Sequence, residues 1–151
     1  LPAHSVLIVK ADAQKRLEPT VYEAEWGYLP CFDNLGKDKR QVLYAYQPGA
    51  SLGMTVSYLG GRRENLIRWD QVYSEQGGMY DMTITYLPAE HRGLQVTING
   101  KTTTVEKLQT KGGLTTITIP VSLKAGYNVI EMGNPYAWAV DIDKFELKQM
   151  N

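Results

Sequence analysis

Hydrophobic and polar residues alternate along much of this chain with a period of two, the pattern of a β-strand that buries one face. The clearest case is residues 79–87, where every even position is apolar and the positions between them are mostly polar. Residues 94–98 repeat the alternation and run into Asn99-Gly100. That pair is typical of a two-residue hairpin turn, because both central residues of such a turn need positive φ.

Nine more segments carry strand patterns, and turn residues separate them at short intervals. They cover residues 5–10, 21–26, 42–46, 54–58, 65–73, 102–108, 114–121, 128–132 and 139–148. No window sustains an amphipathic helix of normal length, and residues 64–68 are the only place where a helical turn is expected. Many short strands at this spacing predict an all-β sandwich or barrel.

Three segments organise the chain. Residues 1–10 hold a lone strand, residues 11–20 are polar and end near Pro19, and residues 21–151 form the main β-domain. The middle segment is typical of a linker. The leading strand is then either the last strand of a preceding β-domain or an edge strand of this one. Because the chain opens with Leu-Pro-Ala-His rather than Met, we expect a fragment or a processed form.

Composition excludes several functional classes. The 151 residues contain 16 Lys+Arg and 16 Asp+Glu, so the formal charge is zero and gives no electrostatic reason to bind nucleic acid or an acidic membrane. No apolar run approaches the roughly 20 residues of a membrane span. One cysteine, Cys31, allows no internal disulfide, and no phosphate loop, nucleophile elbow or HExxH pattern occurs.

Three carboxylates stand out as candidate ligands for a cation. Glu23 and Glu25 lie two apart in an expected strand and so face the same side, while Asp143 shares the parity of Phe145 and Leu147. Asp143 therefore faces the core unless a bulge intervenes. If the first and last strands of the sandwich are neighbours, the three side chains meet, and converging hard oxygens suit Ca²⁺.

Two other interpretations of these carboxylates remain open. Glu23 and Glu25 could face solvent, with Asp143 capping a turn or paired with a lysine. Alternatively, the two glutamates beside Trp26 could form a catalytic carboxylate pair, although a chain of this size is small for a glycosidase.

A second cluster lies in the loop before the last strand. Tyr136 and Trp138 supply aromatic faces, and Asn134 and Asp141 supply groups that bind hydroxyls. Aromatic rings stack on the apolar faces of sugars, so the cluster is a candidate carbohydrate site. The alternative is that Trp138 fills the end of the core.

Five motifs in order resemble the carbohydrate-binding modules of families six and thirty-five. They are Val21-Tyr22-Glu23-Ala24-Glu25, Gly78-Met79-Tyr80 with the strand ending at Tyr86, the Val96–Gly100 hairpin, Leu123–Asn128, and Trp138 with Asp141–Leu147. The resemblance implies a jelly-roll β-sandwich of two antiparallel sheets, of the galactose-binding-domain-like kind. It also implies structural Ca²⁺ on Glu23, Glu25 and Asp143, helped by backbone carbonyls near residues 49–52.

The same resemblance implies a non-catalytic module that binds poly- or oligosaccharide through Trp138, Asn134, Tyr136 and Asp141. One position departs from the family pattern: Leu114 follows Gly112-Gly113, where many members place an aromatic residue. That departure favours a second hypothesis, a sugar-silent structural domain that packs on the catalytic domain of its parent enzyme.

Residues 1–10 resemble the final strand of the C-terminal β-domain of family twenty-seven α-galactosidases. This resemblance implies that the module belongs to an exported glycoside hydrolase of the α-galactosidase kind. An extracellular or periplasmic location follows from it, with the parent's catalytic domain as a partner.

Overall fold

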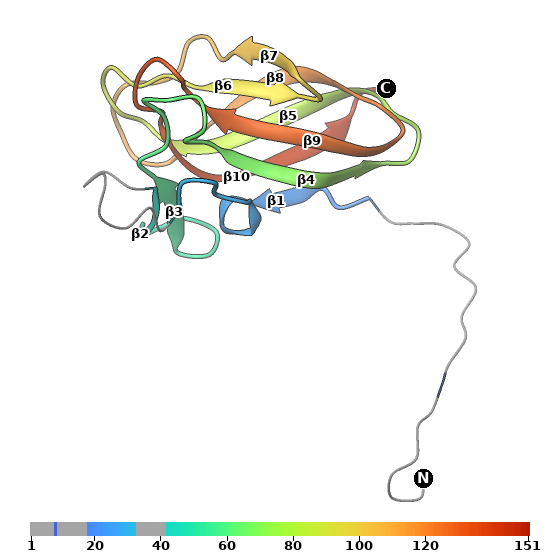
Figure 1. Ribbon diagram of the computed structural model, residues 1–151, viewed down its shortest axis with the longest axis horizontal. Helices are drawn as coiled ribbons and strands as arrows, with labels where there is room; N and C mark the ends of the chain where they lie inside the picture. Colours follow the sequence, from blue (N-terminus) through green and yellow to red (C-terminus); the bar gives the residue numbers. More distant parts are fainter. Residues whose placement is uncertain (1–7, 9–17, 33–41) are drawn as a thin grey trace, which may run out of the picture.

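Two antiparallel β-sheets packed face to face form the protein in the computed structural model (Figure 1). The structure describes residue 8, residues 18–32 and residues 42–151. A 3-10 helix η1 (Ala24–Trp26) accompanies the ten strands. The strands are β1 (Val21–Glu23), β2 (Leu43–Tyr46), β3 (Met54–Ser57), β4 (Ile67–Ser74), β5 (Gly78–Leu87), β6 (Gln95–Ile98), β7 (Lys101–Thr104), β8 (Thr115–Leu123), β9 (Gly126–Gly133) and β10 (Asp141–Gln149).

The first sheet, sheet A, has the order β2-β3-β10-β5-β8, and β1 also pairs with β10. β5 follows one edge of β10 along its length, whereas the other edge is shared: β1 pairs with Glu146 to Lys144, and β3 pairs with Ile142. The second sheet, sheet B, has the order β4-β9-β6-β7. The shared edge of β10 creates a junction inside sheet A where two strands meet end to end.

The predicted all-β class and the alternation along β5 are confirmed. Its even positions are buried in the core, and they are Tyr80, Met82, Ile84 and Tyr86. Asn99 and Gly100 have φ values of 49° and 88°, as the predicted hairpin turn requires. In the part of the chain that the structure describes, no helix is long and apolar enough to cross a membrane.

The expected strand over residues 21–26 is wrong in its second half. β1 ends at Glu23, and the chain enters η1. The indole N–H of Trp69 donates to the Glu23 carbonyl at 3.0 Å, which fixes this carbonyl outside the sheet ladder. After η1 the backbone crosses Ile67 so closely that a Cβ on Gly27 would lie 2.4 Å from the Ile67 Cγ1 atom. Glycine at residue 27 therefore permits the exit from β1.

Other expectations need smaller corrections or lie outside the described residues. β7 ends at Thr104, well before residue 108, although the Val105 N–H still donates to the Leu94 carbonyl at 2.9 Å and the Val105 side chain is buried. Residues 64–68 do not form a helical turn, since β4 begins at Ile67. The predicted strand at residues 5–10, except residue 8, and the linker at residues 11–17 lie outside the described residues.

Candidate functional site

Two of the three predicted carboxylates, Glu23 and Asp143, meet at Ser51 where β1 and β3 adjoin along β10, and the charges of both act on the third, Glu25. Glu23 is paired with Lys144 and Ile142 with Val56, so Asp143 sits between the two partner strands. The register of β10 against β5 shifts between Ile142 and Lys144, which makes Asp143 the extra residue of a β-bulge. We call Glu23, Glu25, Ser51 and Asp143 the carboxylate junction.

Ser51 joins two of the carboxylates. Its hydroxyl lies 2.5 Å from Glu23 Oε2 and 3.1 Å from Asp143 Oδ1, and its backbone N–H donates to Asp143 Oδ1 at 3.1 Å. A hydroxyl has one proton, so it donates to only one of these carboxylates at a time. Because Glu23 and Asp143 are both buried, the junction holds more negative charge than its donors can satisfy.

The loop between β2 and β3 brings Ser51 to this position. The Gln47 N–H donates to the Gly53 carbonyl at 2.9 Å, which closes the loop. Gly49 and Gly53 have φ values of 88° and 77°, in the region that favours glycine. The sequence predicted a contribution of backbone carbonyls from this loop. In the structure it is the N–H and hydroxyl of Ser51 that reach Asp143.

Glu25 is the unsatisfied member of the junction. Both of its carboxylate oxygens are shielded from solvent, and neither accepts a hydrogen bond from another described residue. Burial raises the pKa of the Glu25 carboxyl, an interaction with its own backbone N–H opposes the rise, and the charges of Glu23 and Asp143 add to it. The prediction that Glu25 shares a strand face with Glu23 is wrong, because η1 and not β1 delivers Glu25.

The donor set of the junction suits a hard cation. Among residues 8, 18–32 and 42–151, no group of three or more His, Cys, Asp or Glu side chains is placed so that it could hold a metal ion. The Ser51 hydroxyl occupies the space between Glu23 and Asp143, which explains the separation of these carboxylates. Unpartnered Glu25 oxygens beside two further carboxylates nevertheless fit the all-oxygen ligation that Ca²⁺ prefers.

A second feature is a hollow of about 570 Å³ on the outer face of sheet B. Gln95 and Thr97 point outward because Val96 between them is buried, and Glu131 points outward between Ile130 and Met132. The Thr97 and Thr102 hydroxyls are hydrogen-bonded at 2.8 Å across β6 and β7. These side chains give the hollow a polar floor.

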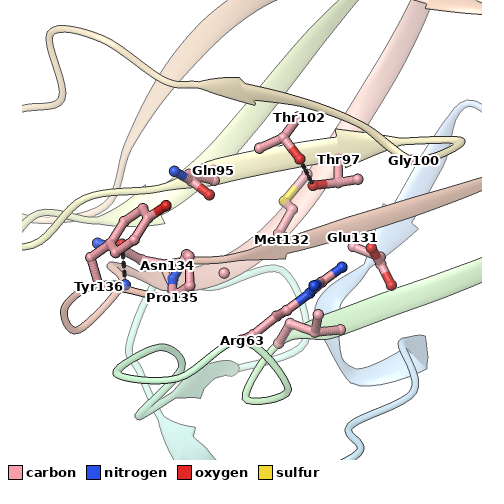
Figure 2. A pocket seen from close by; sticks show the side chains of 12 residues that line it. Arg63, Gln95, Thr97, Gly100, Thr102, Glu131, Met132, Asn134, Pro135 and Tyr136 are labelled. Atoms are coloured by element: carbon pink, nitrogen blue, oxygen red, sulfur yellow. Dashed lines mark hydrogen bonds between the residues drawn. The ribbon is translucent and has the colours of Figure 1, made fainter.

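The loop that follows β9 forms one wall. Asn134, Pro135 and Tyr136 line the hollow, and the Tyr136 side chain is 86% exposed (Figure 2). The Tyr136 N–H donates to Asn134 Oδ1 at 3.2 Å, and the Gly61 N–H donates to the Asn134 and Ala137 carbonyls at 2.9 Å each. The loop is therefore held in shape while its tyrosine ring faces solvent.

Arg63 and Leu66, from the segment between β3 and β4, also line the hollow. A Cβ on Gly133 would lie 3.1 Å from the Leu66 Cβ atom, so this glycine lets that segment approach the floor. Figure 2 shows Tyr136 and Asn134 towards one end of the hollow and Glu131 towards the other.

The four residues of the predicted sugar cluster are divided between two places. Asn134 and Tyr136 line the hollow, whereas Trp138 is half-buried against Tyr58, with ring centroids 6.2 Å apart. Asp141, the first residue of β10, forms an ion pair with Arg92 at 3.3 Å. Burial raises the pKa of the Asp141 carboxyl, against the opposing effects of a Ser57 hydrogen bond and of Arg92.

Sequence reasoning missed the lining residues Arg63, Gln95 and Glu131. Alternation in β6 and β9 marks Gln95 and Glu131 as outward positions, but it does not distinguish a binding floor from an ordinary solvated face.

Comparison with solved structures places the fold. A family 35 carbohydrate-binding module from Clostridium thermocellum is 28% identical, with a TM-score of 0.71 over 85% of this chain and 98% of that one. The chain has the fold of a family 35 carbohydrate-binding module. No family model matches the sequence, and no curated protein sequence matches it either.

Domains of the same fold also occur within larger enzymes. An exo-β-1,3-galactanase from Phanerochaete chrysosporium, solved with galactose, is 24% identical with a TM-score of 0.71, over 85% of this chain and 29% of that one. A GH26-CBM35 β-(1,4)-mannanase from Podospora anserina is 24% identical with a TM-score of 0.66, over 90% of this chain and 28% of that one. The family 35 resemblance of the sequence is thereby confirmed at the level of fold. The α-galactosidase resemblance of residues 1–10 stays a prediction.

Proposed function

We propose that this chain is a non-catalytic carbohydrate-binding module that binds a poly- or oligosaccharide in the hollow on sheet B. The observation that carries the proposal is the Tyr136 ring, which is 86% exposed at the rim of a polar-floored hollow. An exposed aromatic face beside polar groups is the arrangement that sugar recognition uses. Similarity to a family 35 module over 98% of its length supports the proposal.

Different lining residues of the hollow would contact different parts of the sugar. Tyr136 would stack on the apolar face of one sugar ring, and the amides of Asn134 and Gln95 would bind its hydroxyls from either side. Arg63 and Glu131 add a donor and an acceptor of opposite charge. Trp138 and Asp141 remain candidates of the sequence-predicted site, although both are engaged with other side chains.

Calcium is proposed as a structural brace, held by Glu23, Glu25 and Asp143. Its role would be to neutralise the carboxylate junction and to join β1, η1, β10 and the loop that carries Ser51. The unpartnered oxygens of Glu25 support this assignment.

The parent protein is proposed to be an exported glycoside hydrolase, extracellular or periplasmic, and the sequence of residues 1–10 favours one of the α-galactosidase kind. The two enzymes that contain a similar domain act on a β-1,3-galactan and a β-1,4-mannan, as their names state. These two polysaccharides, together with galactomannan, are therefore the first ligands to test.

Affinity electrophoresis in gels that contain each polysaccharide tests the proposal. We expect at least one of the three to retard the wild type and Tyr136→Ala to lose most of the retardation, because truncating a central aromatic contact removes much of a small interface's energy. Tyr46→Ala is the matched control, since this tyrosine is 79% exposed on β2 of the other sheet.

The comparison of Tyr136→Ala with Trp138→Ala locates the site. A loss confined to Tyr136→Ala places the sugar in the hollow, whereas a loss confined to Trp138→Ala places it in the sequence-predicted cluster. Absence of retardation of the wild type by all three polysaccharides would contradict the proposed function.

A sugar-silent structural domain is the second candidate, and exposed apolar side chains beside the carboxylate junction favour it. Trp26 on η1 is 66% exposed and Leu52, next to Ser51, is 54% exposed. Such residues are suited to packing on another domain. In the full parent chain, Trp26→Ser would then accelerate proteolytic release of the module. An unchanged release rate would exclude Trp26 from an interdomain contact.

A further inference from the structure

We propose that the sugar-binding surface extends beyond the hollow, along the outer face of sheet B, to a second aromatic platform formed by Tyr73 and Tyr127. The ligand would then be an internal stretch of a linear polysaccharide that covers several sugar rings. This inference rests on the proposed function and specifies its class of ligand.

β9 provides a continuous path between the two places. Asn128, Ile130 and Met132 are buried in the core, so the alternate residues Tyr127, Val129 and Glu131 face outward. Gly133 lies six positions after Tyr127, which corresponds to about 20 Å of extended strand. Gly133 already lines the hollow, so the path starts at the Tyr136 wall and runs the length of sheet B.

The distal end of the path is aromatic. Tyr73 and Tyr127 are directly opposite each other in the β4–β9 register, with ring centroids 5.6 Å apart and an interplanar angle of 61°. Tyr127 remains 43% exposed, and the neighbouring Val129 remains 37% exposed. An apolar surface of this kind at the end of a polar floor offers a second ring face for stacking.

The middle of the path is polar. Glu131 is directly opposite Thr97 in the β6–β9 register, and Thr97 is opposite Thr102 in the β6–β7 register. The order along the surface is therefore an aromatic ring, a band of hydroxyls and a carboxylate, and a second aromatic pair. A linear glycan presents apolar ring faces and hydroxyl edges along its whole length, so this order matches an extended chain and exceeds what one sugar needs.

A series of ligand lengths tests the inference. The probes are β-1,4-manno-oligosaccharides and β-1,3-galacto-oligosaccharides from disaccharide to hexasaccharide, and isothermal titration calorimetry measures their affinity. For the wild type we expect tighter binding of the hexasaccharide than of the disaccharide. Tyr127→Ala should weaken hexasaccharide binding about tenfold and leave disaccharide binding unchanged, as loss of one aromatic contact predicts.

Two further variants keep this result interpretable. Tyr136→Ala should weaken binding of both lengths, and Val129→Asp, on the same path, should reproduce the length-selective loss if Tyr127→Ala affects folding. Tyr46→Ala again serves as the exposed-tyrosine control.

The extended platform would be overturned if Tyr127→Ala and Val129→Asp both left hexasaccharide affinity unchanged. The proposed function would still stand in that case if Tyr136→Ala abolished binding. Equal affinity of the wild type for all ligand lengths would likewise overturn the extended platform but not the proposed function. Failure of both sugar series to bind the wild type would overturn the proposed function, and the platform with it.

Discussion

Asn128 and Glu25 are both polar side chains shielded from solvent, but they differ in how many hydrogen bonds their side chains make. Asn128 is fully buried and makes five hydrogen bonds. Its Oδ1 accepts from Asn99 Nδ2 and the Lys124 N–H, and its Nδ2 donates to the carbonyls of Val72, Lys124 and Gly126. Glu25 has two shielded oxygens that accept no hydrogen bond from the other described residues.

The difference separates a structural polar group from a candidate binding group. A saturated amide is a brace between strands, since it has no capacity left for a ligand. A shielded carboxylate with no donor costs stability until a cation or a proton arrives. Burial of a polar side chain alone therefore does not identify a site; its hydrogen-bond balance does.

Removal of the fully hydrogen-bonded Asn128 amide should have the largest effect on stability. Asn128→Ala leaves the Lys124 N–H and several carbonyls without partners, so we expect a loss of at least about 3 kcal/mol in the free energy of unfolding. Urea unfolding measures the loss, which should be equal with and without calcium. A loss below about 1 kcal/mol would show that water replaces the amide, and the contrast with Glu25 would weaken.

Calcium should have the next largest effect. Free calcium at a hundredfold excess over its Kd would stabilise the domain by about 2.7 kcal/mol. That corresponds to a rise in Tm of about 5–10 °C over the same protein in EDTA. Magnesium should give a smaller rise because it loses its waters reluctantly. An unchanged Tm in calcium and in EDTA would remove the proposed brace.

Glu25→Gln should change stability in opposite directions under these two conditions. In EDTA the variant removes a charge that Glu23 and Asp143 repel, so its Tm should exceed that of the wild type. In calcium it loses a ligand, so the calcium-induced rise should shrink. Asp70→Asn is the matched control, because Asp70 is an exposed carboxylate paired with Arg68 at 2.8 Å. A lower Tm for Glu25→Gln in both conditions would show that Glu25 has a protein partner and is not unsatisfied.

The sequence predicted the three carboxylates of the junction and the adjacency of the first and last strands of the sandwich, which the pairing of β1 with β10 confirms, but it did not predict the Ser51 hydroxyl between two of the carboxylates. Parity placed Asp143 inward, but the bulge at Asp143 means that its position depends on β1 and β3 sharing one edge of β10. Glu25 was expected on a strand, because nothing in Ala24-Glu25-Trp26 signals a 3-10 turn. The contact that helps to end β1 comes from Trp69, distant in sequence, and local pattern does not report such contacts.

The hollow was harder to predict than the core. Periodicity identified β5 because burial requires apolar residues at every second position, whereas the floor of the hollow uses the polar residues of any solvated strand face. Tyr136 and Asn134 were found because an aromatic residue and an amide in a short loop are a chemical signal. Arg63 became a candidate only because the fold brings its loop beside the loop that carries Tyr136.

The smallest expected effect concerns Asp141. This carboxylate has hydrogen-bond and ion-pair partners, yet burial still disfavours its charged form. Arg92 and Ser57 interact with it, yet burial raises its pKa above the ordinary value of 3.8. Between 3.8 and the raised pKa, the folded state keeps a proton that the unfolded state has released. The contribution of Asp141 to stability therefore falls as pH rises through that window. Asp141→Asn removes this pH-dependent contribution, so the Tm of the wild type minus the Tm of the variant should decrease as pH rises.

If this Tm difference instead increases with pH, the Arg92 ion pair outweighs the effect of burial on the Asp141 carboxylate. A single good partner would then be enough to turn a buried carboxylate into a purely structural group.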